Sequence, residues 1–208
     1  MKFLRIDSPI YTLLTRIVNI VLLNVLWVLC SIPIVTMGAA TAALYYTMLK
    51  INRDEDTLIT EMFFRAFRQN LKQGSGLTIL FVVSGVLLYA DYNIYKSMEG
   101  TMSSIALAGL VLLVVVWGMI FSYAFPLLAQ FDNTMIQTLK NAFFLSVINF
   151  KKTIIIFVMN AIPFVIFLKF PYAFVMYLPI FLTIGFSFIA YINSKLFIKV
   201  FRGYIGEE

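Results

Sequence analysis

Six apolar stretches divide this chain, and most of them are long enough to cross a lipid bilayer as a helix. They cover Pro9–Ile32, Val35–Lys50, Ser75–Tyr95, Met102–Leu128, Thr153–Leu168 and Ala173–Ile192. The hydrocarbon layer of a membrane is about 30 Å thick and needs about 20 apolar residues per helix. The stretches therefore predict an all-α fold, a polytopic transmembrane bundle of six spans in which the second is short.

The basic residues lie almost entirely between alternate stretches. Of sixteen lysines and arginines, only Lys96 and Lys169 fall on the opposite side of this map. The other fourteen are Lys2, Arg5, Arg16, Lys50, Arg53, Arg65, Arg68, Lys72, Lys140, Lys151, Lys152, Lys195, Lys199 and Arg202. Lysine and arginine are retained on the cytoplasmic side of a membrane. We therefore expect a multi-pass protein of the bacterial cell membrane with both termini in the cytoplasm.

The amino-acid composition excludes a soluble domain. The chain is 62% hydrophobic and only 12% charged, so residues 1–208 are expected to form a single integral membrane domain. The net charge of +6 is explained by topology and by contact with anionic lipid headgroups, so we expect no nucleic-acid partner. Cleavage after Ala40-Thr41-Ala42 would release a leader longer than the usual length of about 15–30 residues, which favours a retained first span.

The second stretch, Val35–Lys50, is the shortest of the first four, and whether it crosses fully is left open. The charge distribution favours a crossing, because the N-terminal basic residues and those of 50–72 would otherwise face opposite sides. Its small residues Gly38, Ala39 and Ala43 follow the spacing that lets helix backbones approach closely. We therefore expect a helix-packing face there.

Two amphipathic helices are predicted on the cytoplasmic side. The first opens near Asp54 and repeats an apolar residue every four positions at Ile59, Phe63, Phe67 and Leu71. Its aromatic stripe is flanked by Arg65 and Arg68, which suits a partner's groove or the membrane surface. The alternative is that this helix only covers the cytoplasmic ends of the spans.

The second amphipathic helix is expected over 133–150, capped by Asp132 or Asn133. Its apolar stripe consists of Ile136, Leu139, Phe143, Val147 and Phe150. Short matches, such as Ala66-Phe67 with Ala142-Phe143, suggest that residues 107–170 are a weak internal repeat of residues 35–95. Chance similarity between apolar segments is the other explanation.

The sequence has few residues that could act in catalysis or bind a cofactor or metal ion. The chain has no histidine, a single cysteine (Cys30) and no glycine-rich phosphate loop, so we expect no catalytic residue, cofactor or metal site. The polar candidates within the spans are Asn19, Asn24, Asp91, Asn160 and Asn193. Asn24 and Asn160 are near the middle of their spans. They either line a polar path or form hydrogen bonds between helices.

Several blocks resemble the YesL family of bacterial membrane proteins. The most specific block runs from Asn24-Val25-Leu26-Trp27 through Pro33–Ala40 to Ala43-Leu44-Tyr45, and looser ones are Phe63–Asn70, Phe125-Pro126-Leu127 and Asn141-Ala142-Phe143. The resemblance implies association with sugar uptake, because such proteins tend to be encoded beside carbohydrate importers of the ATP-binding-cassette (ABC) type. It brings no established catalytic residues.

These observations lead to two hypotheses. The first is a non-enzymatic accessory protein that docks on permease or ATPase subunits of a sugar ABC importer through Phe63, Arg65, Phe67 and Arg68. The loop by which ordinary importer permeases engage their ATPase is not found in Gln137–Thr153, so the chain is not expected to be such a permease. The second is a small transporter or channel that acts alone, with Asn24 and Asn160 along its route.

Overall fold

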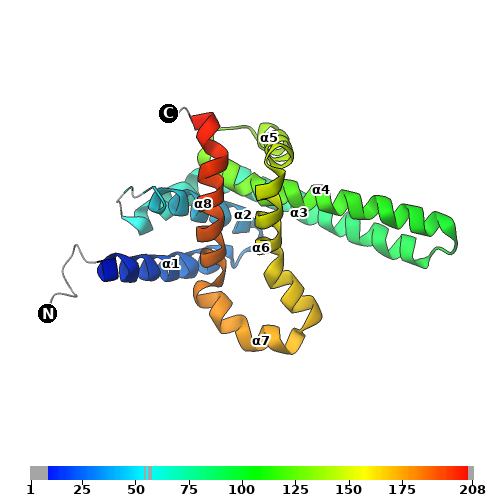
Figure 1. Cartoon of the computed structure of the whole chain (residues 1–208), viewed down its shortest axis with the longest axis horizontal. Helices are drawn as coiled ribbons and strands as arrows, with labels where there is room; N and C mark the ends of the chain where they lie inside the picture. The colour runs from blue at the N-terminus through cyan, green and yellow to red at the C-terminus, as the bar shows by residue number, and fades with distance from the viewer. Residues whose placement is uncertain (1–8, 54, 56–57, 206–208) are drawn as a thin grey trace.

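The computed structural model describes residues 9–53, 55 and 58–205, and every regular element in these ranges is helical (Figure 1). The elements are α1 (Pro9–Ser31), the 3-10 turn η1 (Ile34–Thr36), α2 (Met37–Ile51), α3 (Ile59–Ser97), α4 (Thr101–Gln130), α5 (Met135–Ile148), α6 (Phe150–Lys169), α7 (Pro171–Ile180), the π-helical segment η2 (Phe181–Gly185) and α8 (Phe186–Ile205). The pair Ser8-Pro9 in the sequence predicts Ser8 as the cap of the first helix, and Ser8 lies outside the described residues.

The predicted polytopic helical architecture is confirmed. Within the described ranges, five helical stretches are long and apolar enough to cross a membrane, and α5 with α6 makes a sixth if this bent pair is one span. Large apolar side chains are widely exposed along α1, α3 and α4, which a protein in water would bury. Surrounding lipid explains this exposure.

Helix α2 is the centre of the structure, although it is the shortest of the predicted first four spans. Ten of its fifteen residues are buried, and it packs against α1, α3, α4 and α8. At about 1.5 Å per residue its length is about 22 Å, less than the hydrocarbon thickness. The neighbouring helices therefore shield α2 from lipid over most of its surface.

The crossing of α2 and α3 brings two backbones into direct contact. The backbone N–H of Gly38 donates to Thr78 Oγ1 over 2.9 Å. A Cβ on Gly38 would lie 2.4 Å from the carbonyl oxygen of Gly74, and one on Gly74 would lie 2.6 Å from the nitrogen of Ala39. Ala39 and Ala43 are fully buried. All three predicted packing residues thus lie inside the helix interface.

The prediction of a separate amphipathic helix before the third span is wrong. Residues 59–97 form one continuous helix of 39 residues. Asp54, Asp56 and Thr57 lie outside the described residues. Gly74 does not interrupt α3, because the space that it leaves is filled by α2.

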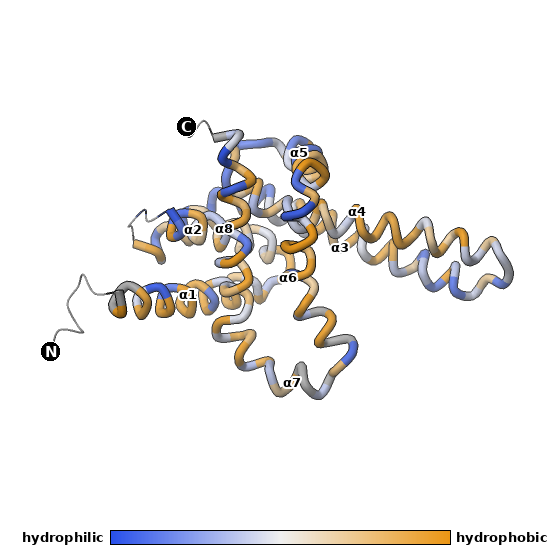
Figure 2. The backbone as a smooth tube through the Cα atoms, in the orientation of Figure 1, coloured by the Kyte–Doolittle hydropathy of each residue, from blue (hydrophilic) through white to orange (hydrophobic). Residues whose placement is uncertain are grey.

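The long helices run in two directions. In Figure 1, α1 and the α3–α4 hairpin extend horizontally, whereas α6 and α8 stand upright. The helix ends that carry the basic clusters lie to the left for the horizontal helices and at the top for the upright ones. The opposite helix ends lie to the right and at the bottom. Figure 2 shows the polar residues concentrated at these ends. A membrane normal that runs from the upper left to the lower right of Figure 1 fits both the horizontal and the upright helices if they are strongly tilted. Tilt also accommodates α3, whose length is about 58 Å.

Two predicted boundaries are corrected. Helix α5 is capped by Thr134, not by Asp132 or Asn133: the Thr134 side chain accepts from the Gln137 N–H, and Gln137 Oε1 accepts from the Thr134 N–H. This reciprocal capping box satisfies two N–H groups at the helix start. The last span, expected to end at Ile192, continues as helix to Ile205 because Phe197 and Phe201 are fully buried.

The two halves of the suggested internal repeat differ in shape. In the first half, the amphipathic segment continues straight into the span within α3. In the second half, α5 meets α6 at a bend of 110°.

Candidate functional site

Asn24 joins α1 to the irregular segment that precedes α8. Its Nδ2 donates to the carbonyl oxygens of Phe181 at 3.1 Å and Leu182 at 2.6 Å, and its Oδ1 accepts from the Ser187 N–H at 2.9 Å. Leu182 and Ser187 are five residues apart, which is the spacing of a π-type hydrogen bond. The Asn24 amide therefore bridges the two backbone groups at the break, and the side chain is fully buried.

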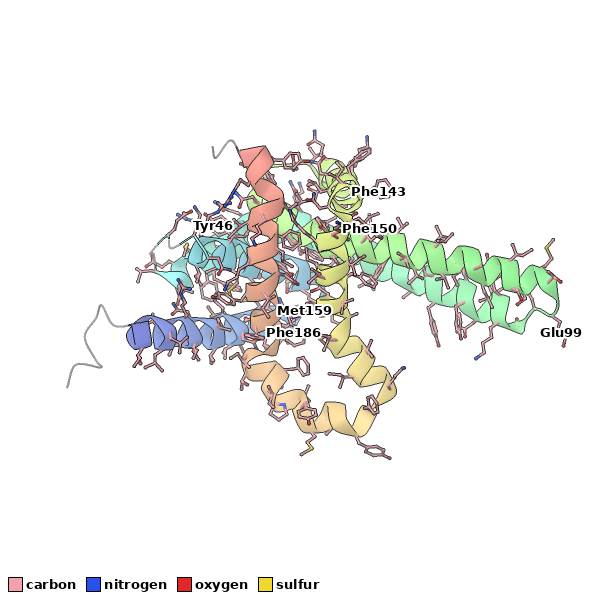
Figure 3. All side chains as sticks on the ribbon, viewed as in Figure 1. Tyr46, Glu99, Phe143, Phe150, Met159 and Phe186 are labelled. Atoms are coloured by element: carbon pink, nitrogen blue, oxygen red, sulfur yellow. The ribbon has the colours of Figure 1, made fainter. Side chains whose placement is uncertain are left out.

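The neighbourhood of Asn24 is closed by aromatic rings. Trp27, one turn further along α1, packs against Phe186 with ring centroids 4.5 Å apart and the rings tilted by 34°, and Figure 3 shows Phe186 beside α1. Trp27 Nε1 also donates to Thr41 Oγ1 over 3.1 Å. These contacts tie α1, α2 and α8 together, so the interhelical role of Asn24 is the one that the geometry supports.

A second polar cluster links α2, α6 and α8. Asn193 Nδ2 donates to Asn160 Oδ1 at 2.9 Å and to the hydroxyl oxygen of Tyr45 at 3.3 Å. Asn193 is fully buried and its Oδ1 has no hydrogen-bond partner within the described structure. An unsatisfied acceptor in such a place is costly, and it distinguishes this cluster from the fully paired amide of Asn24.

The amphipathic start of α3 presents a different face from the one predicted. Phe63 is fully buried and stacks with Phe67, whose ring centroid is 6.4 Å away. Phe64 takes the outward position, with 38% of its surface exposed, and Arg65 and Arg68 next to it are also exposed. An open hollow of about 500 Å³ lies on this face, lined by Thr60, Glu61, Phe64, Arg65, Arg68 and Gln69. Phe63 therefore anchors the helix, and Phe64 is the exposed aromatic residue.

Helix α5 turns its apolar stripe outward. Phe143, Val147 and Phe150 are exposed, and Figure 3 shows Phe143 and Phe150 at the junction with α6. The inward face is instead made of Thr138, Ala142, Leu145 and Ser146. With Lys140 and Lys151 exposed nearby, this arrangement is typical of a helix at a membrane surface.

Further polar contacts join α4 to α6 and α3 to α4. Nothing in the sequence indicated these residues. The Tyr123 hydroxyl and Thr153 Oγ1 are 2.8 Å apart between α4 and α6, and Thr153 Oγ1 also donates to the Ser146 carbonyl oxygen. Between α3 and α4, Trp117 Nε1 donates to Ser84 Oγ over 2.8 Å. Serine, threonine and tyrosine are common in membrane helices, so only the three-dimensional pairing distinguishes these residues.

The described residues contain no group of three or more histidine, cysteine or acidic side chains placed to hold a metal ion. Cys30 is a free, half-buried thiol at the end of α1. The site that the structure offers is therefore a set of helix-to-helix polar contacts and a basic, aromatic surface on α3.

These features define a multi-pass integral membrane protein. A family model described as "Protein of unknown function, DUF624" matches residues 20–92, which cover the second half of α1, all of α2 and most of α3. The uncharacterized protein YesL of Bacillus subtilis (strain 168) is 26% identical over 136 residues. The chain is therefore similar to the DUF624 family over residues 20–92 and distantly similar to that protein.

The matched region spans 64% of this chain and 64% of the Bacillus subtilis protein, so the chain covers less than two thirds of its relative. No solved structure matches. The family match includes Asn24, the α2–α3 glycine crossing and the exposed face of α3.

Proposed function

We propose that this chain is a non-enzymatic accessory protein of the bacterial cell membrane that docks on a permease or ATPase subunit of a carbohydrate ABC importer. The observation that carries the proposal is the exposed face of α3, where Phe64 lies beside Arg65 and Arg68. An exposed aromatic residue next to arginines is the composition typical of protein–protein contacts. The family resemblance supplies the carbohydrate importer as the partner.

Burial of Phe63 supports a docking role for this face. Because Phe63, Met62 and Ala66 are packed inside the protein, the start of α3 cannot rotate, and its outward residues are held in fixed positions. A preorganised surface loses less conformational entropy on binding than a mobile one. Many polar side chains within the spans are occupied by hydrogen bonds within or between helices, which favours a scaffold over an enzyme.

The docking prediction is tested by reversing charge on α3. The double variant Arg65→Glu/Arg68→Glu is expected to lose at least about 90% of the importer subunits that co-purify with the wild type in mild detergent, because the interface charge changes sign. Lys96→Glu/Lys169→Glu carries the same charge change at the opposite helix ends and should co-purify normally. Equal recovery with both variants, or no importer subunit with the wild type, contradicts the proposal.

The proposed orientation places both termini and the α3 face in the cytoplasm. It is supported by the basic residues, which gather at one set of helix ends. Reporters that are active only outside the cytoplasm, fused separately to each terminus, are expected to stay silent, whereas one inserted after Glu99 at the tip of the α3–α4 hairpin should be active. A signal from either terminus overturns this orientation.

One observation favours a second candidate, a transporter that acts alone. The Tyr45–Asn160–Asn193 cluster has an unpartnered, buried acceptor between three helices, and intramembrane polar groups often mark transport routes. Flux into liposomes that contain only the purified protein, abolished by Asn160→Leu, would favour this candidate over the accessory role. Asn24 is a poor test residue because its amide is already occupied.

A further inference from the structure

The turn that follows α2 is fixed against α8. Asn52 Nδ2 donates to the Tyr191 carbonyl oxygen at 3.2 Å and also to Ser194 Oγ. Ser194 is fully buried, so this junction is part of the packed structure. Arg53 directly follows Asn52, so the same contacts bring its backbone close to the part of α8 that carries Tyr191 and Lys195.

Basic side chains from α1 and α8 converge at this junction. Lys195 Nζ lies over the Tyr191 ring, 4.3 Å from its centroid. The Tyr191 side chain also interacts with Arg16 of α1. Two cations that reach one phenol lie close enough to repel each other, and a bound anion would relieve this repulsion.

The guanidinium group of Arg53 has donor atoms that could bind an anion. Its Nε and Nη2 atoms are buried and have no hydrogen-bond partner in the described structure. These two nitrogens form one edge of the guanidinium group, which donates two parallel hydrogen bonds to a phosphate or carboxylate. Burying such an edge without an acceptor is costly, and a bound anion that accepts its hydrogen bonds would remove this cost. The neighbouring Lys50 is already paired with Glu55.

We propose that the α1–α2–α8 junction binds a phosphate group, with the Nε–Nη2 edge of Arg53 donating two hydrogen bonds and Lys195 and Arg16 balancing the charge. The phosphate can belong to the headgroup of an anionic phospholipid or to a soluble phosphate compound. Phosphate fits better than a single carboxylate because three cations surround the junction. The site is separate from the α3 face and does not depend on the proposed importer partner.

The test compares Arg53→Gln with the wild type in two experiments. In the first, protein purified from membranes that contain phosphatidylglycerol and phosphatidylcholine is examined by native mass spectrometry for retained lipid. We expect the wild type to retain phosphatidylglycerol and Arg53→Gln to retain about tenfold less, because a charged bidentate contact is lost. In the second, inorganic phosphate is added to protein in phosphatidylcholine nanodiscs at constant ionic strength, and the thermal unfolding midpoint is measured.

The two experiments separate the sources of phosphate. Selective retention of phosphatidylglycerol supports a lipid site, and a phosphate-dependent rise in the midpoint of the wild type but not of Arg53→Gln supports a soluble ligand. Lys140→Gln removes one exposed positive charge from α5 and should behave as the wild type in both. Equal losses in Lys140→Gln and Arg53→Gln, or no effect of Arg53→Gln in either experiment, overturn the proposal. If Arg53→Gln does not fold, Arg53→Lys, which keeps the charge but loses the paired donors, makes the same comparison.

Discussion

Gly38→Ala is expected to destabilise the protein by about 3 kcal/mol or more, which is the upper range for overpacking a tight interface. The added methyl group would lie 2.3 Å from Thr78 Oγ1, 2.4 Å from the Gly74 carbonyl oxygen and 2.5 Å from Phe125 Cε1. Because the carbonyl belongs to the α3 backbone, it cannot move aside without separating the two helices. The measurement is the unfolding free energy in detergent micelles, followed by loss of helical circular dichroism.

Gly109→Ala is the matched control for this substitution. Gly109 lies within α4, and a Cβ built there has no neighbour within 4 Å. Alanine favours the helix over glycine by about 1 kcal/mol, so this variant should be as stable as the wild type or slightly more stable. Similar stabilities for Gly38→Ala and Gly109→Ala would show that α2 and α3 do not cross in backbone contact.

Asn24→Leu is expected to cost about 3 kcal/mol and to loosen the junction between η2 and α8. The variant leaves the Phe181 and Leu182 carbonyl oxygens and the Ser187 N–H without the partner that Asn24 provides, and each unsatisfied buried group costs about 1–3 kcal/mol. Adjustment of the helix backbone recovers part of this loss. Thermal unfolding gives the stability, and amide hydrogen exchange at 181–187 reports the local opening.

Two further variants identify the cause of the Asn24 effect. Asn19→Leu changes an asparagine of the same helix that is half-exposed, and it should have little effect on stability. Asn24→Asp has nearly the same shape but cannot donate while ionised, and it would bring a carboxylate against two carbonyl oxygens, so it should be at least as destabilising as leucine. A stable Asn24→Asp protein would contradict the hydrogen-bond arrangement described for η2.

The α3 and α5 segments show how far amphipathic periodicity can be used for a membrane protein. Their helical character and basic residues were predictable, because a repeat of every three to four residues is a local property. Which apolar residues point inward was not predictable. In α3 the stripe residue Phe63 is buried, whereas in α5 the stripe residues Phe143 and Val147 are exposed. Lipid accepts apolar side chains as readily as the protein core does, so hydrophobicity alone does not select the inward face.

The candidate site illustrates the same limit. Asn24 and Asn160 stand out in the sequence because amides are rare within apolar stretches, and both take part in contacts between helices. Their partners could not be found from the sequence, because Phe181 and Leu182 contribute backbone atoms to Asn24 and Asn193 is distant along the chain. Arg53 was counted only as one topological charge, since nothing in its local sequence indicates a buried guanidinium edge.

Sequence patterns predict the class of protein, the approximate spans and the grouping of basic residues, because crossing hydrocarbon imposes length and charge rules on each segment separately. The tertiary structure alone decided that α2 is the central helix, that the third span and its amphipathic start form one rod, and that Asn24 bridges a π-helical break. Those features depend on which small residues and polar groups meet across helices, and packing settles that only when all the segments are present together.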